Sequence, residues 1–411
     1  MEYSLNPINL HNYDSSHFDG KHYNNEPGTP YNFYSYEGKS TDFLNFFFNT
    51  DCTTKLPSRN PKNDFLAFNS NNNSNQSHDI QKNNEDSLQE GGSIYDDDIN
   101  ICPNVVAHCW NIGHATILIQ LNNFFIITDP IFESYASPAP GFIIRSTPAA
   151  CSISELPPID IILISHNHYD HMNKPSIQKI KEKNPKAVIL CPLNLGQRYL
   201  NKWKIKNYIE FDWRQYIDFH KSNSNFRPMN SNISNMVPNL VSDKDTLRIT
   251  CMPARHASAR NGFDWDEVLW CSWLLNFNDN LISIYFPGDT AVGPHFSEIY
   301  EQNNNKCPLD LLLCPIGPQL PSEMMRNVHL DGVEGKQMSE DIHAKTVVPI
   351  HHGVFPLGFK PEKTDLEIAV DAWNQGNSQN DLICWKIGGR VDYDTRLRKF
   401  VASDDEQIMN S

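Results

Sequence analysis

Residues 159–172 read IDIILISHNHYDHM, an apolar run that ends abruptly in side chains of the metal-binding kind. Residues 159–164 are too few for a core helix and are rich in β-branched side chains, so they predict a fully buried strand. The candidate ligands that follow within six residues are His166, His168, Asp170 and His171. Imidazole together with carboxylate suits zinc or another borderline divalent metal. The alternative is a solvated loop that is merely rich in histidine.

The first hundred residues hold most of the negative charge. The chain has 411 residues and a formal net charge of −15. Residues 1–100 contain 15 Asp or Glu and 6 Lys or Arg, a net of −9, so the remainder carries −6. Neither part is basic. This argues against nucleic acid as a partner, because phosphate backbones are bound by clustered Lys and Arg.

The ten cysteines are scattered, and none forms a C-x-x-C pair. Several lie within apolar runs, which is typical of reduced, buried thiols in an intracellular protein. The first twenty residues are polar and lack the apolar segment of a signal peptide, and no stretch is long enough to span a bilayer. We therefore expect a cytoplasmic protein that associates at most peripherally with membranes.

Composition divides the chain into a polar extension and a folded domain. Residues 1–100 are rich in Asn, Ser and Asp without a sustained period, which predicts a largely disordered extension. The apolar patch at residues 43–48 could dock onto the domain, contact a lipid interface or have no role. The folded domain is predicted over residues 101–395, with a surface insertion at 221–245 and a flexible tail at 396–411.

Short apolar runs recur from residue 105 onward, and helical stretches fall between some of them. Prolines open two of the helices. The predicted helices lie near residues 176–183, 295–300, 333–343 and 366–373. Predicted strands dominate the first half of this region, and predicted helices become more frequent in the second half. This pattern fits two packed sheets with helices outside.

Three later strands end in further ligand-type side chains. His256 comes shortly after an apolar run, Asp289 stands in a Pro-Gly-Asp-Thr turn, and His351 directly follows another apolar run. In that turn Gly288 permits the sharp bend that would present the carboxylate. Each of the three alone would more often be a turn or surface residue. Together they repeat the arrangement of residues 159–171, a short strand followed by a ligand.

These positions resemble the metallo-β-lactamase fold superfamily, whose signature is H-x-H-x-D-H followed by His, Asp and His at later strand ends. Further segments look like the branch of N-acyl-phosphatidylethanolamine-hydrolysing phospholipases D. These segments are residues 113–116 (GHAT), 128–132 (TDPIF), 154–160 (SELPPID), 165–171 (SHNHYDH), 287–290 (PGDT) and 315–317 (PIG). The resemblance covers residues 104–390. Its Ile-His-x-Gly frame favours His351 over His352 as the last ligand.

The resemblance implies an α/β (α+β four-layer) αββα sandwich of two mixed sheets with outer helices. It also implies two Zn²⁺ ions per chain. One would be held by His166, His168 and His256, the other by Asp170, His171 and His351, and Asp289 would bridge them. A carboxylate between two dications lowers their repulsion, and a shared water becomes acidic enough to yield hydroxide near neutral pH. The implied products are an N-acylethanolamine and phosphatidic acid.

Other polar residues have weaker interpretations. We predict Asp170, Asp289 and His329 as the catalytic groups, and His329 as a substrate-binding residue that positions phosphate or protonates the leaving alkoxide. A surface histidine before a helix capped by Asp331 is the alternative for His329. His114 and Asp129 are interpreted as groups that orient ligands. Arg255 and Arg260 are expected to be solvated, with contact to lipid phosphate as the alternative.

Residues 137–145 form a proline-rich loop whose apolar tip consists of Phe142, Ile143 and Ile144. The tip could insert into a phospholipid headgroup layer or pack against the domain. A homodimer is compatible with the sequence. The same fold also serves hydrolases of other esters, lactones or thioesters, and nucleases, although the low basic content disfavours nucleases. A scaffold in which metals only stabilise the fold is the non-enzymatic alternative.

Overall fold

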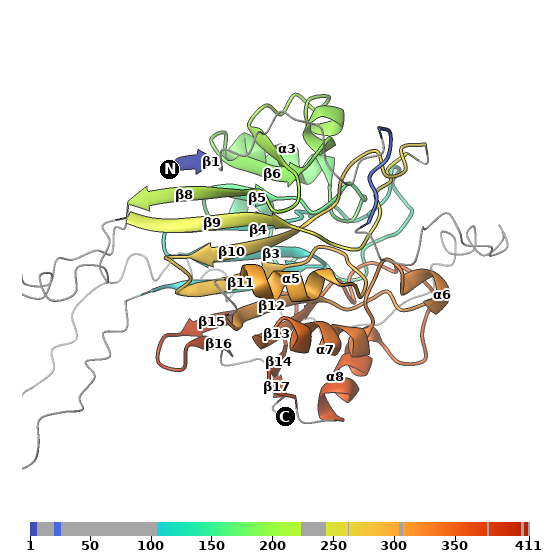
Figure 1. Ribbon diagram of the computed structural model, residues 1–411. Helices are drawn as coiled ribbons and strands as arrows, with labels where there is room; N and C mark the ends of the chain where they lie inside the picture. The colour runs from blue at the N-terminus through green and yellow to red at the C-terminus, as the bar shows by residue number, and fades with distance from the viewer. Residues whose placement is uncertain are drawn as a thin grey trace, which may run out of the picture.

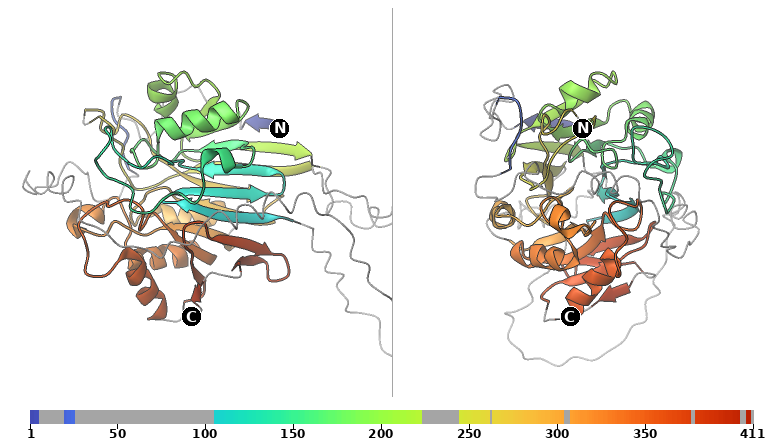
Figure 2. Two further views of the ribbon diagram at one scale, coloured as in Figure 1. Left: turned by 180° about the vertical axis from the view of Figure 1, so that it is seen from behind. Right: turned by 90° about the vertical axis from the view of Figure 1, so that its right-hand side faces the viewer.

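Two mixed β-sheets lie face to face in the computed structural model, with helices on their outer faces (Figure 1). The structure describes residues 1–5, 20–25, 105–222, 244–261, 263–303, 307–375, 378–403 and 407–409. The turned views in Figure 2 place helix α3 (Lys174–Lys183) at one end of the layers and helix α8 (Asp365–Asn374) at the other. The predicted αββα architecture is confirmed.

The eight-stranded sheet begins antiparallel and becomes parallel from β4 to β7. Its order is β16 (Lys399–Ala402), β15 (Arg390–Asp394), β2 (Ala107–Gly113), β3 (Thr116–Leu121), β4 (Phe124–Thr128), β5 (Ile161–Leu163), β6 (Val188–Pro192) and β7 (Tyr208–Phe211). The strand predicted before the H-x-H-x-D-H segment is thus β5. It is shorter at both ends than the predicted range of residues 159–164.

The nine-stranded sheet is parallel from β11 to β14 and antiparallel elsewhere. Its order is β1 (Glu2–Leu5), β8 (Tyr216–Ser222), β9 (Lys244–Met252), β10 (Ser272–Phe277), β11 (Ile282–Phe286), β12 (Leu309–Pro315), β13 (Ala344–Ile350), β14 (Asp381–Cys384) and β17 (Gln407–Met409). Strands β9, β11 and β13 precede His256, Asp289 and His351, so this sheet delivers all three later ligand candidates to one edge.

Alternation along each strand decides which layer a side chain enters. In β5, Ile161 and Leu163 enter the core between the sheets, whereas Ile162 joins the cluster under helix α3. In β12, Leu311 enters the same central core and Leu312 faces the helices on the other side. Both faces are buried, which is why these strands read as unbroken apolar runs in the sequence.

The four predicted helices are present, with clear start signals. Asn173 caps α3 by accepting from Ser176 N, and Asp331 and Thr364 each form a capping box with the glutamate three residues on. The other helices are α5 (His295–Gln302), α6 (Ser322–Met325) and α7 (Gly332–Asp341), with short helical turns η2 (Ile153–Glu155) and η3 (Gly196–Leu200). Helices α5, α7 and α8 pack on the nine-stranded sheet through apolar side chains such as Phe296, Met338 and Trp373.

Parts of the predicted extension and tail are ordered. Residues 396–411 were predicted to be flexible, yet β16 pairs with β15 and Phe400 is completely buried in the central core. Burying a phenylalanine stabilises a fold by roughly 1.5–3 kcal/mol, which offsets part of the entropy lost when the strand is ordered. Within residues 1–100, β1 pairs with β8 and Tyr23 is buried. The patch at residues 43–48 lies outside the described residues.

The predicted insertion at residues 221–245 is shorter at its ends, because β8 extends to Ser222 and β9 begins at Lys244. Residues 223–243 lie outside the described part of the chain. Among the helices that are described, none combines the length and hydrophobicity needed to cross a bilayer.

Candidate metal centre

The H-x-H-x-D-H segment makes a single turn between β5 and α3. Met172 N donates to His168 O at 2.8 Å and closes the turn. Asn173 then caps α3 by accepting from Ser176 N at 3.0 Å. A buried strand on one side and a capped helix on the other therefore hold the four candidate ligands of the segment in place.

Three imidazoles form a first group. Nδ1 of His168 lies 2.8 Å from Nε2 of His166 and 3.2 Å from Nε2 of His256. These three nitrogens and a carboxylate oxygen of Asp289 all lie within 4.8 Å of one another. The sequence predicted these three histidines as one ligand set, and the structure brings them together from β5 and β9.

A second group lies beside the first. Nε2 of His171 and Nε2 of His351 are 3.0 Å apart, and Oδ2 of Asp170 is 3.4 Å from each. His114 joins this group through Nε2, which lies 2.9 Å from Oδ2 of Asp170. His351, not its neighbour His352, is the histidine that enters the group.

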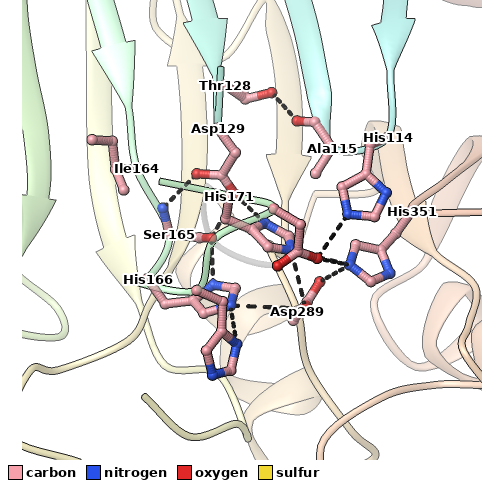
Figure 3. Close-up of polar contacts among 12 residues, drawn as sticks. His114, Ala115, Thr128, Asp129, Ile164, Ser165, His166, His171, Asp289 and His351 are labelled. Atoms are coloured by element: carbon pink, nitrogen blue, oxygen red, sulfur yellow. Dashed lines mark hydrogen bonds and ion pairs between the residues drawn. The ribbon is translucent and has the colours of Figure 1, made fainter. Parts of the chain in front are cut away.

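Asp289 lies between the two groups (Figure 3). Its Oδ2 is 3.8 Å from Nε2 of both His166 and His256 in the first group, and 3.1 Å from Nε2 of His171 in the second. Its Oδ1 is 3.1 Å from Nε2 of His351. One carboxylate thus faces nitrogens of both groups, which is the arrangement expected of a bridging ligand.

Gly288 allows Asp289 to approach the segment after β5. It has a φ of +62°, and a Cβ there would lie 2.4 Å from Cβ of Ser165. Any larger residue would push β11 away from the end of β5. The glycine predicted to permit a sharp turn is therefore also required for close packing of the two sheets at the site.

Asp129 forms hydrogen bonds with the first and the last residue of the segment 165–171 that follows β5. Its Oδ1 accepts from Ser165 N at 2.7 Å, and its Oδ2 accepts from Ser165 Oγ at 2.5 Å and from His171 Nδ1 at 2.7 Å. It is completely buried. Asp129 therefore fixes the ring of His171 from behind, which fits its predicted orienting role. Ser165 was missed as a functional residue, although it stands between the strand and the first histidine.

Three further imidazoles are oriented in the same way, through the ring nitrogen that faces outward. Nδ1 of His256 lies 2.8 Å from the carbonyl of Val328, and Nδ1 of His351 lies 2.9 Å from the carbonyl of Gly317. Nδ1 of His166 lies 2.9 Å from Oγ of Ser165. Because Nδ1 donates to these acceptors, Nε2 is the ring nitrogen that faces the centre in each case.

This donor set fits a divalent metal. Lone pairs of neutral imidazoles that face one another at 2.8–3.2 Å repel unless a proton or a cation lies between them. Donors about 2.1 Å from a tetrahedral zinc would themselves be about 3.4 Å apart, close to the spacing within each group. Nitrogen and carboxylate oxygen are ligands that zinc accepts. Small movements would therefore seat one ion in each group.

Electrostatics distinguish the two groups. Burial lowers the pKa of His256 to about 3, that of His168 to about 4, and that of His166 well below its usual value. Burial also acts against charge on His171 and His351, but the carboxylates of Asp289 and Asp170 outweigh it. They raise the pKa of His171 well above its usual value and that of His351 to about 9. The carboxylates therefore favour positive charge mainly in the second group.

His329 lies at the rim of the centre. Its Nδ1 is 3.7 Å from Oδ2 of Asp289, and its ring stacks at 5.5 Å on that of His351. Burial lowers the pKa of His329 to about 3, so the imidazole is neutral near pH 7. It borders a hollow whose polar lining includes Gln319, Ser322, Arg326, Asp331 and Glu334. His329 thus lies beside the ligands, and it also precedes α7, whose N-cap is Asp331 as the alternative expected.

The two arginines expected to be solvated are not. Arg260 stacks over the ring of Tyr169 at 3.9 Å and donates to the carbonyl of Asn167 at 2.8 Å. Arg255 donates to the carbonyl of Val292 at 2.7 Å. Both side chains are half-buried. Their carbonyl and aromatic partners come from loops distant in sequence, so no local pattern reveals them.

Comparison with known proteins identifies the family. A family model described as "Beta-lactamase superfamily domain" matches residues 125–352. The chain belongs to the beta-lactamase superfamily. It is 31% identical over 258 residues to "N-acyl-phosphatidylethanolamine-hydrolyzing phospholipase D 1" of Caenorhabditis elegans, covering 60% of this chain and 64% of the relative. The predicted superfamily is confirmed, and this relative supports the predicted branch.

Two further similarities are weaker. The chain is 27% identical over 307 residues to "N-acyl-phosphatidylethanolamine-hydrolyzing phospholipase D, mitochondrial" of Saccharomyces cerevisiae, covering 74% of this chain and 59% of the relative. It therefore spans less than two thirds of the length of both phospholipase relatives. A metal-dependent hydrolase of Hyperthermus butylicus is 22% identical over 63% of this chain and 89% of its own length. The relatives are named as hydrolases, in agreement with the predicted enzyme class.

Proposed function

We propose that this protein is a dizinc phosphodiesterase that hydrolyses N-acylated phosphatidylethanolamine at membrane surfaces, giving an N-acylethanolamine and phosphatidic acid. The observation that carries the proposal is the position of Asp289, whose two oxygens lie 3.1 Å from Nε2 of His171 and of His351 while the first group faces it at 3.8 Å. A phosphodiester needs charge stabilisation on both sides of phosphorus, and two adjacent cation sites provide it. The phospholipase relatives supply the substrate class.

We assign the first group of histidines to one ion and Asp170, His171 and His351 to the other, with Asp289 shared. Bound zinc would acidify a water molecule to serve as nucleophile and stabilise the charge that develops on the phosphoryl oxygens. The chain itself supplies the orientation. Asp129 and the carbonyls of Val328 and Gly317 fix the ligand rings, so that little reorganisation is needed during the reaction.

The hollow beside His329 offers donors to the phosphate of the substrate from Gln319, Ser322 and Arg326, while its two carboxylates, Asp331 and Glu334, accept backbone hydrogen bonds in the capping box of α7. His329 is 14% exposed at its side chain, so it can reach a ligand while its ring stays packed on His351. A neutral imidazole donates a hydrogen bond to a phosphoryl oxygen through N–H. The guanidinium of Arg326 borders the same hollow and suits a second phosphate oxygen. His329 would thus position the phosphodiester, which is one of the two roles predicted for it from the sequence.

An apolar loop tip near the centre supports action at a bilayer. Phe142 and Ile144 are 48% and 56% exposed, whereas Ile143 packs with Ile131 and Phe355. The ring of Phe355 in turn meets that of His114 edge to face at 5.2 Å. The loop tip is therefore anchored through Ile143 and Phe355, next to His114 of the second group. Insertion of its two exposed side chains into the headgroup layer would bring the hollow close to the lipid.

The loop is tested by the double substitution Phe142→Ser with Ile144→Ser. We expect weaker sedimentation with phospholipid vesicles and lower turnover of vesicle substrate, with turnover of a soluble phosphodiester unchanged. Leu397→Ser is the matched control, because Leu397 is also exposed, at 61%, on a turn far along the chain. Equal vesicle binding by the double variant and the control would remove the loop from the proposal.

The main experiment compares substrates with zinc-loaded protein. Vesicles containing N-acyl-phosphatidylethanolamine should release N-acylethanolamine and phosphatidic acid in equal amounts. If the protein hydrolyses soluble lactones or thioesters but releases no N-acylethanolamine from vesicles, the substrate assignment is wrong and the metal centre stands. Bound zinc without any hydrolysis would favour the scaffold alternative, and both outcomes contradict the phospholipase assignment.

A further inference from the structure

Residues 20–25 lie against the loop that carries His256, although more than 230 positions separate them in sequence. In Figures 1 and 2 they form a short blue segment beside the yellow loop that follows β9. Tyr23 is 2% exposed and belongs to the central core. Its amide donates to the carbonyl of Asp266 at 2.6 Å. A buried aromatic side chain and a main-chain hydrogen bond therefore anchor this segment to the domain.

Asn25 then bonds twice to the main chain of His256. Its Oδ1 accepts from His256 N at 3.1 Å, and its Nδ2 donates to His256 O at 3.0 Å. A carboxamide that bonds both the N–H and the C=O of one residue pairs with it as a neighbouring β-strand would. It therefore fixes the position and the orientation of the main chain at that residue. In the described part of the chain, both main-chain groups of this candidate ligand are thus bonded to Asn25.

The loop held in this way starts at His256 and returns at residue 268. Ser258 and Asp266 close its base, with Asp266 N donating to Ser258 O at 2.7 Å and Ser258 N donating to Asp266 Oδ1 at 2.9 Å. Tyr23 binds the returning side of this base and Asn25 binds the outgoing side. We call residues 23–25 the N-terminal clasp, because they join the two sides of the loop.

The other ligands have supports within the folded domain. The amide of His351 donates to the carbonyl of His114 at 3.2 Å, and His171 lies in the turn that leads into α3. The ring of His256 is supported by the carbonyl of Val328, and the main chain of Arg255 before it is bonded to Thr290 and Ala291. The amide and the carbonyl of His256 itself are bonded to a segment from the start of the chain. The first group is therefore the one whose geometry can change when the clasp is altered.

We propose that Asn25 is a positioning residue for the metal ligand His256, so that the affinity of the first group for its cation depends on the N-terminal clasp. The proposal rests on the proposed metal centre. Groups that orient a ligand ring typically contribute about 10- to 100-fold to metal affinity. Asn25 acts on the main chain rather than the ring, so its loss should weaken one of two ions by about tenfold and leave the other unchanged.

The test uses the full chain loaded with zinc and titrated with a chromophoric chelator. Asn25→Ala should release one of two zinc ions at about tenfold lower chelator concentration than the unaltered protein. Asn24→Ala is the matched control, since Asn24 is the exposed neighbour, and it should release zinc normally. Asn25→Asp keeps the size of the side chain but sets a carboxylate oxygen against the carbonyl of His256, so it should weaken the same ion.

A second measurement separates this inference from the metal centre itself. In metal-free protein, hydrogen exchange at the amide of His256 should be faster in Asn25→Ala than in Asn24→Ala, because the acceptor of that amide is gone. If the unaltered protein binds no zinc, the metal centre fails, and the exchange result still tests the clasp. Equal zinc release and equal exchange among Asn25→Ala, Asn25→Asp and Asn24→Ala would overturn the inference.

Discussion

The two groups of candidate ligands are built from similar side chains but are supported differently. In the first group, the pKa values of all three imidazoles are lowered, and the supports of His166 and His256 are uncharged: the hydroxyl of Ser165, the carbonyl of Val328 and the amide of Asn25 on the main chain of His256. In the second, carboxylates surround His171 and His351 and raise their pKa values. The second group therefore carries its own compensating negative charge, whereas the first depends on the shared carboxylate of Asp289. We expect the second group to bind its ion more tightly.

Asp289→Asn should have the largest effect, because it removes the one charge that both groups share while keeping the volume. We expect turnover to fall at least about 10²-fold and the first group to lose its ion before the second. Initial rates on vesicle substrate and zinc stoichiometry by mass spectrometry measure these two quantities. A rate near that of the unaltered protein would contradict the two-ion assignment, provided that circular dichroism shows an intact fold.

Asp129→Asn should affect the second group selectively. The substitution removes the charge that orients His171, although it keeps a polar side chain near Ser165. Groups in this position contribute about 10- to 100-fold to metal affinity, so the ion of the second group should be weakened by that factor. Chelator titration compares it with Asp279→Asn, a substitution in the turn between β10 and β11. If Asp129→Asn weakens zinc binding equally in both groups, the two ligand groups are not oriented independently of each other.

The smallest effect is expected from Asp365, beside the second group. This carboxylate approaches Gly317, whose carbonyl binds His351, and burial raises the pKa of Asp365 to about 6. A raised carboxyl pKa means that the folded state binds more protons than the unfolded state between pH 4 and 6, so stability falls as pH rises through that window. Asp365→Asn should remove this slope and stabilise the protein at pH 7 by on the order of 1 kcal/mol.

Urea unfolding at pH 4.5 and pH 7 measures that difference. Glu182→Gln on α3 is the control, because its side chain is exposed to solvent. If Asp365→Asn keeps the pH dependence of the unaltered protein, the buried carboxylate is not its source.

Much of the centre could be predicted because His166, Asp289 and His351 follow strands whose last residues form apolar runs. Such strands are recognisable in sequence, and the edge where parallel strands end gathers the residues that follow them. This is why His166, Asp289 and His351 could be proposed as neighbours from the sequence alone. The helices were equally accessible, since Asn173, Asp331 and Thr364 are local start signals.

What could not be predicted depends on contacts between distant segments. Tyr23 and Asn25 stand in a polar stretch without periodicity, and only the tertiary structure places them on the His256 loop. Strand β16 lies in a region that was predicted to be a tail, because a strand of four residues gives little periodic signal. Arg260 was expected in solvent because stacking on Tyr169 requires two loops to meet.

Zinc-edge anomalous scattering from crystals of the intact protein tests the two-ion centre most directly. A two-ion centre should give two peaks per chain on either side of the Asp289 carboxylate, one reached by His166, His168 and His256 and the other by Asp170, His171 and His351. The absence of a peak at either group, or a single peak away from Asp289, would contradict it.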